Sequence, residues 1–256
     1  MRLTHRALLQ SSIACAMTSK AYTPRHRSWP YSPNDFGRYD SSPDASFYHI
    51  PRFVTHIDDH AISKLEAYYS STLPHQGVIL DLCSSWISHL PPDLENLAKD
   101  RSSGFKVIGM GMNKRELDGN PVLSETIVQD LNDNPTIPLI GPLDAATCVV
   151  SIDYLTRPLE VLSSLRRHLK GGSTVHLVVS NRCFPTKVIR RWLETSEPER
   201  LEMVADYLHF AGFVDIQIVE LSDGWAILPP PDSDSVPGNK VRVDPLWVVR
   251  GTAPSL

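Results

Sequence analysis

The sequence predicts an α/β protein whose mostly parallel, doubly wound sheet has seven strands and helices on both faces. Three observations support this prediction. Short apolar runs alternate with segments of helical period along most of the chain. The length of 256 residues and the hydrophobic fraction of 41% suit a single buried core. Polar residues directly follow the apolar runs, which is typical of strands that end at a ligand-binding edge.

The first half of the chain supplies one helix and four strands. Residues 55–69 begin with carboxylates and place Ile62, Leu65 and Tyr69 at helical spacing, which predicts a capped amphipathic helix that ends before Pro74. The apolar runs that we expect as the first four strands are Val78–Leu82, Lys106–Gly111, Thr126–Gln129 and Ala145–Ile152.

The second half supplies two further helices and three strands. Residues 158–169 begin with proline, place leucines on one face and end before Gly171 and Gly172, which predicts a helix. Ser196 and Glu199 form a capping-box pattern that opens another helix, which we expect to reach Gly212. The remaining expected strands are Ser173–Ser180, Val214–Val219 and Pro245–Val249, with a loop at Pro229–Pro231.

The charge of the chain is unevenly distributed. The first 34 residues contain five basic residues and no acid, which is typical of a transit peptide for a mitochondrion or plastid; a disordered basic tail is the alternative. We therefore expect residues 1–45 to form a largely disordered lead and residues 46–256 to form the folded domain. The net charge of −4 gives no basic footprint, so we expect no nucleic-acid partner. No apolar run reaches the roughly 18 residues of a membrane span.

The cysteines and histidines do not predict a metal site. The four cysteines are Cys15, Cys83, Cys148 and Cys183, and none of them forms a Cys-x-x-Cys pair, so neither a disulfide framework nor a zinc knuckle is indicated. His56 and His60 have the i, i+4 spacing of metal ligands, but no third ligand accompanies them. We therefore expect no bound metal.

Several segments occur in the order that is typical of one enzyme family. Asp81 ends the first strand and a tight turn follows it, Asp130 follows the third strand, and the segment His168–Gly172 precedes the fifth. From residue 47 to residue 250 the chain resembles the class I S-adenosylmethionine-dependent methyltransferases. The strings that resemble a narrower subgroup, with a Ser-Ser-Trp variant of the first motif, are Phe47–Asp58, Asp81–Pro91, Gly109–Asn113 and Ser180–Lys187.

This resemblance implies a Rossmann-like fold, S-adenosylmethionine as the cofactor and a small-molecule methyl acceptor. It also assigns roles to residues at the strand ends. The implied cofactor-binding residues are Asp81, Cys83, Ser84, Ser85, Trp86, Met112, Asn113, Asp130 and Leu131. The implied catalytic residues are His89, Asp153 and Tyr154. The implied acceptor-binding residues are Tyr48, Arg52, His56, Asn181 and Arg182.

Two positions depart from the family pattern. The first motif normally has glycines where this chain has Cys83, Ser84 and Ser85, and the acid that usually ends the second strand is replaced near Gly111. These departures support an alternative, a methyltransferase-like protein that binds a ligand or partner without catalysis. A nicotinamide-dependent oxidoreductase would need a third glycine after Gly109 and Gly111, which the chain lacks.

Three of the expected site residues have structural alternatives. Trp86 either walls the cofactor site or packs under the sheet. His89 either takes a proton from the methyl acceptor or has a structural role. His56, together with Asp58, either contacts the acceptor or caps the following helix.

Overall fold

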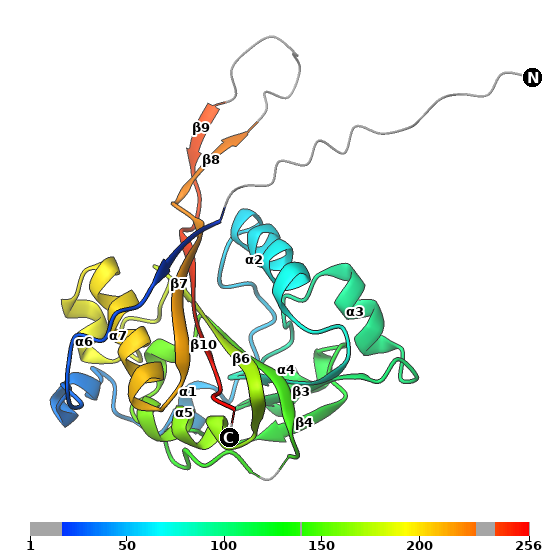
Figure 1. The fold of residues 1–256 in the computed structure, drawn as a ribbon, viewed down its shortest axis with the longest axis horizontal. Helices are drawn as coiled ribbons and strands as arrows, with labels where there is room; N and C mark the ends of the chain where they lie inside the picture. Colours follow the sequence, from blue (N-terminus) through cyan, green and yellow to red (C-terminus); the bar gives the residue numbers. More distant parts are fainter. Residues whose placement is uncertain (1–16, 139, 229–238, 256) are drawn as a thin grey trace, which may run out of the picture.

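A single sheet organises the protein (Figure 1). The computed structural model describes residues 17–138, 140–228 and 239–255. Eight strands lie in the order β1-β7-β10-β6-β5-β2-β3-β4. Their bounds are β1 (Thr18–Ala21), β2 (Gly77–Leu82), β3 (Phe105–Gly111), β4 (Glu125–Val128), β5 (Leu143–Val149), β6 (Leu169–Ser180), β7 (Val214–Ser222) and β10 (Leu246–Thr252).

The pairing of the strands gives a mostly parallel, Rossmann-like sheet. Strands β4, β3, β2, β5 and β6 are parallel neighbours, whereas β10 lies antiparallel between β6 and β7. All seven expected strands are present, so the predicted α/β class is confirmed. The expected number of strands is wrong, because β1 adds an eighth strand, antiparallel to β7 at the sheet edge.

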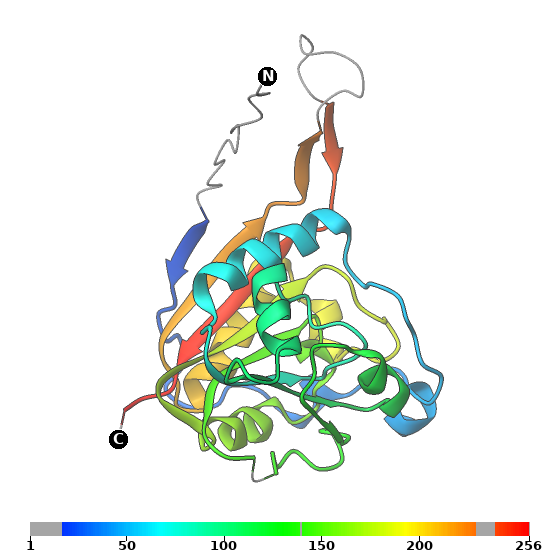
Figure 2. The ribbon, with the colours of Figure 1, turned by 90° about the vertical axis from the view of Figure 1, so that its right-hand side faces the viewer.

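Helices cover both faces of the sheet (Figures 1 and 2). One face carries α2 (Asp59–Thr72), α3 (Pro92–Lys99) and α4 (Lys114–Gly119) over one apolar core. The other carries α5 (Pro158–Arg166), α6 (Arg190–Glu194) and α7 (Glu197–Phe210) over a second. The shorter elements are η1 (Pro33–Phe36), α1 (Asp44–Phe47) and η2 (Ile152–Tyr154).

The helix starts form as the sequence predicts. Asp58 is the N-cap of α2, and its carboxylate accepts a hydrogen bond from the Ala61 backbone N–H at 2.8 Å. The Ser196–Glu199 capping box opens α7, where the Glu199 carboxylate accepts from the Ser196 backbone N–H at 2.8 Å. Pro158 is the first residue of α5.

Residues 17–45 belong to the folded domain, which corrects the expectation of a disordered lead. Thr18–Ala21 pair with β7 as strand β1. Behind this strand, the hydroxyls of Tyr22 and Tyr31 donate to the fully buried carboxylate of Asp206 on α7, and the Arg25 guanidinium lies 2.7 Å from the same carboxylate. Most of the expected transit peptide, residues 1–16, lies outside the described residues.

A two-stranded arm projects from the body of the protein (Figure 1). It consists of β8 (Trp225–Leu228) and β9 (Asn239–Arg242), which pair antiparallel in a sheet of their own. The expected loop at Pro229–Pro231 lies outside the described residues. Among the described helices, none is long and apolar enough to cross a membrane.

Candidate functional site

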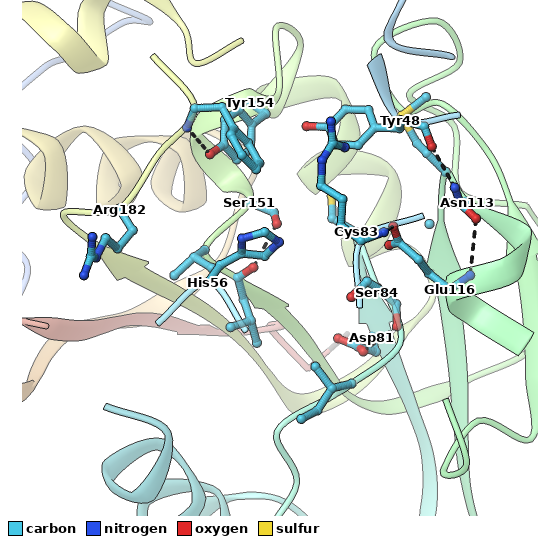
Figure 3. Close-up of a pocket in the computed structure, with 18 of the residues that line it drawn as sticks. Tyr48, His56, Asp81, Cys83, Ser84, Asn113, Glu116, Ser151, Tyr154 and Arg182 are labelled. Atoms are coloured by element: carbon cyan, nitrogen blue, oxygen red, sulfur yellow. Dashed lines mark hydrogen bonds between the residues drawn. The ribbon is translucent and has the colours of Figure 1, made fainter. Parts of the chain in front are cut away.

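A cavity of about 610 Å³ lies at the carboxyl ends of the central strands (Figure 3). This volume lies within the range of about 300–1,000 Å³ that is typical of small-molecule sites. The turn after β2, the ends of β3, β4 and β5, and the segment 182–184 after β6 contribute to its wall. Residues 48–58, which we call the strap, supply the remaining side of the cavity.

Most of the expected site residues line this cavity. They are Tyr48, Arg52, His56, Asp81, Cys83, Ser84, Ser85, His89, Met112, Asn113, Asp130, Leu131, Tyr154 and Arg182. Three expected residues, Trp86, Asp153 and Asn181, do not line it.

The turn after β2 is held by the carboxylate that precedes it. Asp81 accepts hydrogen bonds from the hydroxyls of Ser84 and Ser88 at 2.7 Å and from the hydroxyl of Thr147 at 3.1 Å. Burial raises the pKa of Asp81 to about 6, and the three hydroxyls oppose this rise. Cys83 adopts the left-handed conformation with φ of 54°, which turns the chain directly after the end of β2. Asp81 therefore fixes the turn and has little capacity left for a ligand.

Gly111 at the end of β3 allows this turn to approach its neighbouring strand. A Cβ atom at Gly111 would lie 2.1 Å from the carbonyl oxygen of Ser84. The Ser84 backbone N–H donates to the carbonyl of Met110 at 2.7 Å, so the turn lies directly on β3. Gly111 therefore allows the turn to pack closely against β3, where a side chain would push the two apart.

Asn113, an expected cofactor ligand, is fully occupied by the protein itself. Its amide NH₂ donates to the carbonyls of Tyr48 and His49 at 2.8 and 3.3 Å. Its carbonyl oxygen accepts from the backbone N–H groups of Arg115 and Glu116 as the N-cap of α4. An amide can make about four such bonds, so Asn113 ties the strap to α4 and has no hydrogen-bonding capacity left for the cofactor role expected of it.

Glu116 is a cavity residue that the sequence reasoning missed. One of its carboxylate oxygens accepts from the Arg52 backbone N–H at 2.6 Å, and burial raises the pKa of Glu116. The other oxygen has no hydrogen-bond partner among the described residues. An acid in the first turn of the helix that follows β3 is the sequence signal that could have identified it.

Trp86 lies outside the cavity and also holds the strap. Its indole N–H donates to the Val54 carbonyl at 3.1 Å, and its ring makes an edge contact with Phe53 at 6.2 Å between centroids. Of the two alternatives that the sequence left open, packing therefore describes Trp86 better than a cofactor wall, although the packing partner is the strap and not the sheet.

The end of β4 presents Asp130 and Leu131 to the cavity. One oxygen of Asp130 accepts from the Asn132 backbone N–H at 2.8 Å, and the other has no partner among the described residues. The side chain of Asn132 makes its hydrogen bonds within the protein, since it donates to Asp44 at 2.8 Å and accepts from the Thr156 backbone N–H at 2.7 Å. Asp130 thus has free capacity for a polar ligand.

His89 lines the cavity and has one buried, unpartnered nitrogen. The side chain is 7% exposed, and its Nδ1 atom has no hydrogen-bond partner among the described residues. Burial, together with the neighbouring His56, lowers the pKa of His89 to about 4. Burial also lowers the pKa of His56, with a further contribution from Arg52. Both imidazoles are therefore neutral near pH 7.

Asp153 does not reach the cavity, which contradicts its expected catalytic role. Its carboxyl group is buried, with one oxygen unpartnered, and burial raises its pKa to about 8. The chain turns into η2 at this point and directs Asp153 beneath the wall. The next residue, Tyr154, does line the cavity, where its hydroxyl accepts from the Phe184 backbone N–H at 2.8 Å.

Arg182 is held away from the centre of the cavity. Its Nε donates to the Asp244 carboxylate at 2.8 Å, and in Figure 3 its guanidinium extends away from His56. Asp244 and Asp58 each accept from the other's backbone N–H, at 2.9 and 2.7 Å. Asn181 is exposed and lines a second, polar cavity of about 530 Å³, which we call the outer pocket.

Backbone strain concentrates around the cavity. Four non-glycine residues in the described part of the chain have positive φ, and Cys83, His89 and Val150 are three of them, all in the cavity wall. Such a conformation is rare for a β-branched residue such as Val150, whose φ is 40°. Strain of this kind is typical of functional sites. The described residues contain no group of three or more His, Cys, Asp or Glu side chains that could hold a metal ion.

Comparison with known proteins yields structural but not sequence relatives. No protein-family model matches the chain, and no curated protein matches its sequence. A S-adenosylmethionine-dependent methyltransferase from Archaeoglobus fulgidus superposes with a TM-score of 0.50 and 16% identity, covering 75% of this chain and 94% of that one. A chain from a complex between a methyltransferase activator and a methyltransferase of Haloferax volcanii gives a TM-score of 0.50 and 15% identity over 77% and 91% of the two chains. At these identities the similarity extends to the fold.

Proposed function

We propose that the protein is a class I S-adenosylmethionine-dependent methyltransferase that acts on a small-molecule acceptor. The observation that carries this proposal is the Cys83–Ser85 turn, which packs against Gly111 and lines the cavity at the strand ends. The turn lines the cavity at the carboxyl ends of the strands, which is where doubly wound sheets bind their ligands. The shared fold is consistent with the proposal.

The residues around the cavity fit the three parts of this cofactor. The turn that contains Ser84 and Ser85 offers backbone and hydroxyl groups to the methionine part. The free carboxylate oxygen of Glu116 suits the ribose hydroxyls, and that of Asp130 suits the adenine amino group. S-adenosylmethionine supplies the methyl group on a cationic sulfonium.

The protein's own contribution is to position the acceptor and exclude water. Tyr48, His56, Tyr154 and Phe184 line the part of the cavity beyond the turn, and the strap covers it. Because the leaving group is already activated, alignment of the acceptor in a water-poor cavity supplies much of the rate. His89 also lines this cavity, as a neutral imidazole.

The non-catalytic alternative is not favoured. It rested on the replacement of the first-motif glycines, and the turn that carries the replacements, Cys83–Ser85, still lines the cavity. It also rested on the missing strand-end acid, for which Glu116 offers a carboxylate in the same cavity.

Calorimetric titration of the purified protein with S-adenosylmethionine, S-adenosylhomocysteine and NAD tests the proposal. We expect saturable micromolar binding of the first two and none of NAD. Asp130→Asn and Glu116→Gln should each weaken binding about tenfold, as the loss of one charged hydrogen bond implies. Glu125→Gln, on the exposed edge strand β4 and outside the cavity, is the matched control. A folded protein that binds neither adenosyl compound would refute the proposal.

A further inference from the structure

Two cysteines that the proposed reaction does not use lie next to each other at the centre of the sheet. Leu82, the last residue of β2, pairs with Cys148 of β5, and Cys83 follows Leu82 directly. Neighbouring strands lie about 4.8 Å apart and consecutive Cα atoms about 3.8 Å apart, so the Cα atoms of Cys83 and Cys148 are ~6 Å from each other. A disulfide spans Cα separations of about 4.4–6.8 Å. The backbone therefore holds this pair at bonding range.

The side chains of the two cysteines also face each other. Cys83 packs against the apolar core that contains Cys148, and both are free thiols. The neighbouring Cys83 thiol, together with burial, raises the pKa of Cys148 well above its usual range. The third free cysteine of the described residues, Cys183, follows β6, which is one strand further from Cys83. Cys148 is therefore the partner of Cys83 that the fold provides.

The two thiols differ in accessibility. Cys148 is fully buried on β5, where it pairs with Leu82 of β2 and Leu177 of β6. Cys83 is half-buried and lines the cavity, and Figure 3 shows it beside Ser84 in the turn after β2. A small oxidant in the cavity therefore reaches Cys83 first, with Cys148 directly behind it. An accessible cysteine next to a second thiol that can resolve its oxidised form is typical of reversible thiol oxidation.

A bond between these cysteines would move the turn after β2. The S–S bond is about 2.05 Å long, which is shorter than any non-bonded contact between two sulfur atoms. Cys148 is held by strands on both sides, so the turn that begins at Cys83 has to give way. The same turn contains Ser84 and Ser85, which line the cavity, and the Ser84 backbone N–H donates to the Met110 carbonyl at 2.7 Å. The bridge would therefore displace the groups that we assign to the methionine part of the cofactor.

We infer that Cys83 and Cys148 form a reversible disulfide, through which a peroxide converts the protein from a form that binds S-adenosylmethionine to a form that binds it weakly. This inference rests on the proposed function and adds a means of regulating the same site.

The oxidation balances with hydrogen peroxide as the oxidant. The Cys83 thiolate attacks one peroxide oxygen, so that an S–O bond forms while the O–O bond breaks, and the products are a sulfenic acid and one water. The Cys148 sulfur gives up its proton and attacks the Cys83 sulfur, so that the S–S bond forms, the S–O bond breaks and a second water leaves. Two thiols and one peroxide thus give one disulfide and two waters. A small thiol such as dithiothreitol reverses the reaction by exchange and is itself oxidised to a disulfide.

Disulfide mapping of the purified protein tests the bridge. After treatment with hydrogen peroxide, the remaining thiols are alkylated, the protein is digested, and the joined peptides are identified by mass spectrometry. We expect a peptide pair joined through Cys83 and Cys148, which dithiothreitol separates and which Cys183→Ser still forms. Absence of this pair, or a bridge to Cys183 in its place, overturns the inference. This readout needs no cofactor.

Calorimetry with S-adenosylhomocysteine tests the consequence of the bridge. The oxidised protein should bind about tenfold more weakly than the reduced protein, as the loss of one charged hydrogen bond implies. Dithiothreitol should restore the affinity, which separates the bridge from methionine oxidation, because this thiol does not reduce methionine sulfoxide. Equal affinities of the bridged and reduced forms overturn the inference.

Variants separate the bridge from other effects of peroxide. Cys83→Ser and Cys148→Ala should each lose the joined peptide pair, and in Cys83→Ser peroxide should no longer lower the affinity in a way that dithiothreitol reverses. In Cys148→Ala the sulfenic acid at Cys83 has no resolving thiol, so dimedone should label Cys83 more strongly than in the wild type. Unchanged labelling contradicts the role of Cys148. Reduced wild-type protein that binds no S-adenosylhomocysteine contradicts the proposed function, whereas binding by the reduced protein without a mapped bridge contradicts this inference alone.

Discussion

Replacement of Gly111 by alanine should disrupt the turn on which the proposed cofactor site depends. The new Cβ would lie 2.1 Å from the Ser84 carbonyl oxygen, and an ordinary contact begins at 3.4 Å, so the turn must move by about 1.3 Å. Such overpacking costs ~2 kcal/mol, which corresponds to a decrease in Tm of roughly 4–8 °C for a chain of this size. The movement also strains the 2.7 Å hydrogen bond from Ser84 to Met110.

Cofactor affinity is the informative readout for Gly111→Ala. If the displaced turn loses one or two hydrogen bonds to the cofactor, S-adenosylhomocysteine affinity falls by about ten- to a hundredfold. Thermal unfolding and calorimetry measure the two effects on the same sample. Gly37→Ala is the control, since its Cβ would lie 3.4 Å from its nearest neighbour and its φ of −61° suits alanine. Wild-type affinity in folded Gly111→Ala would show that the ligand does not use this turn.

Three further perturbations test other parts of the structure. Burial raises the pKa of Asp153 from 3.8 to about 8, so the folded state loses stability as the pH rises between these two values. Asp153→Asn should remove this loss, and in denaturant unfolding its stability relative to wild type should increase by ~1.4 kcal/mol per pH unit over this range. A stability difference that does not change with pH would contradict the burial of this carboxyl group. Deletion of residues 1–31 removes β1 and the partners of buried Asp206, and should lower the free energy of unfolding by ~3–5 kcal/mol. Asp206→Ala in the deleted protein should recover part of this loss, because it removes the unpaired buried carboxylate. Unchanged stability after the deletion would mean that this segment is no part of the domain. Trp86→Phe keeps an aromatic ring but loses the hydrogen bond to the Val54 carbonyl, so amide exchange of residues 53–56 should accelerate about fivefold while cofactor affinity stays unchanged. Weaker cofactor binding with unchanged amide exchange would instead make Trp86 a wall of the cofactor site.

The strands and helix starts were predictable because their signals are local. The apolar run at Val78–Leu82 and the cap at Asp58 depend on neighbouring residues, and both form as expected. Strand β1 was missed because it is short and polar, and its pairing with β7 and the bonds to the distant carboxylate of Asp206 help to hold this segment in the domain. Sequence composition does not reveal such long-range partners.

Most of the predicted site residues line one cavity, but only some of them have side chains with capacity left to bind a ligand. Strand ends identify which residues lie near the cavity, so Ser84, Asp130 and Tyr154 line it as expected. The direction and the remaining bonding capacity of a side chain depend on tertiary contacts. Asn113 lies in the cavity wall with all of its hydrogen bonds spent, and Asp153 is turned beneath the wall although its neighbour is not.

Binding of S-adenosylhomocysteine to the purified, folded protein is the measurement that tests the central claim most directly. Our account predicts saturable micromolar binding that weakens about tenfold in Asp130→Asn and by ten- to a hundredfold in Gly111→Ala, with Gly37→Ala unchanged. Absence of binding by the folded wild-type protein, or equal affinity in all of these variants, would contradict it.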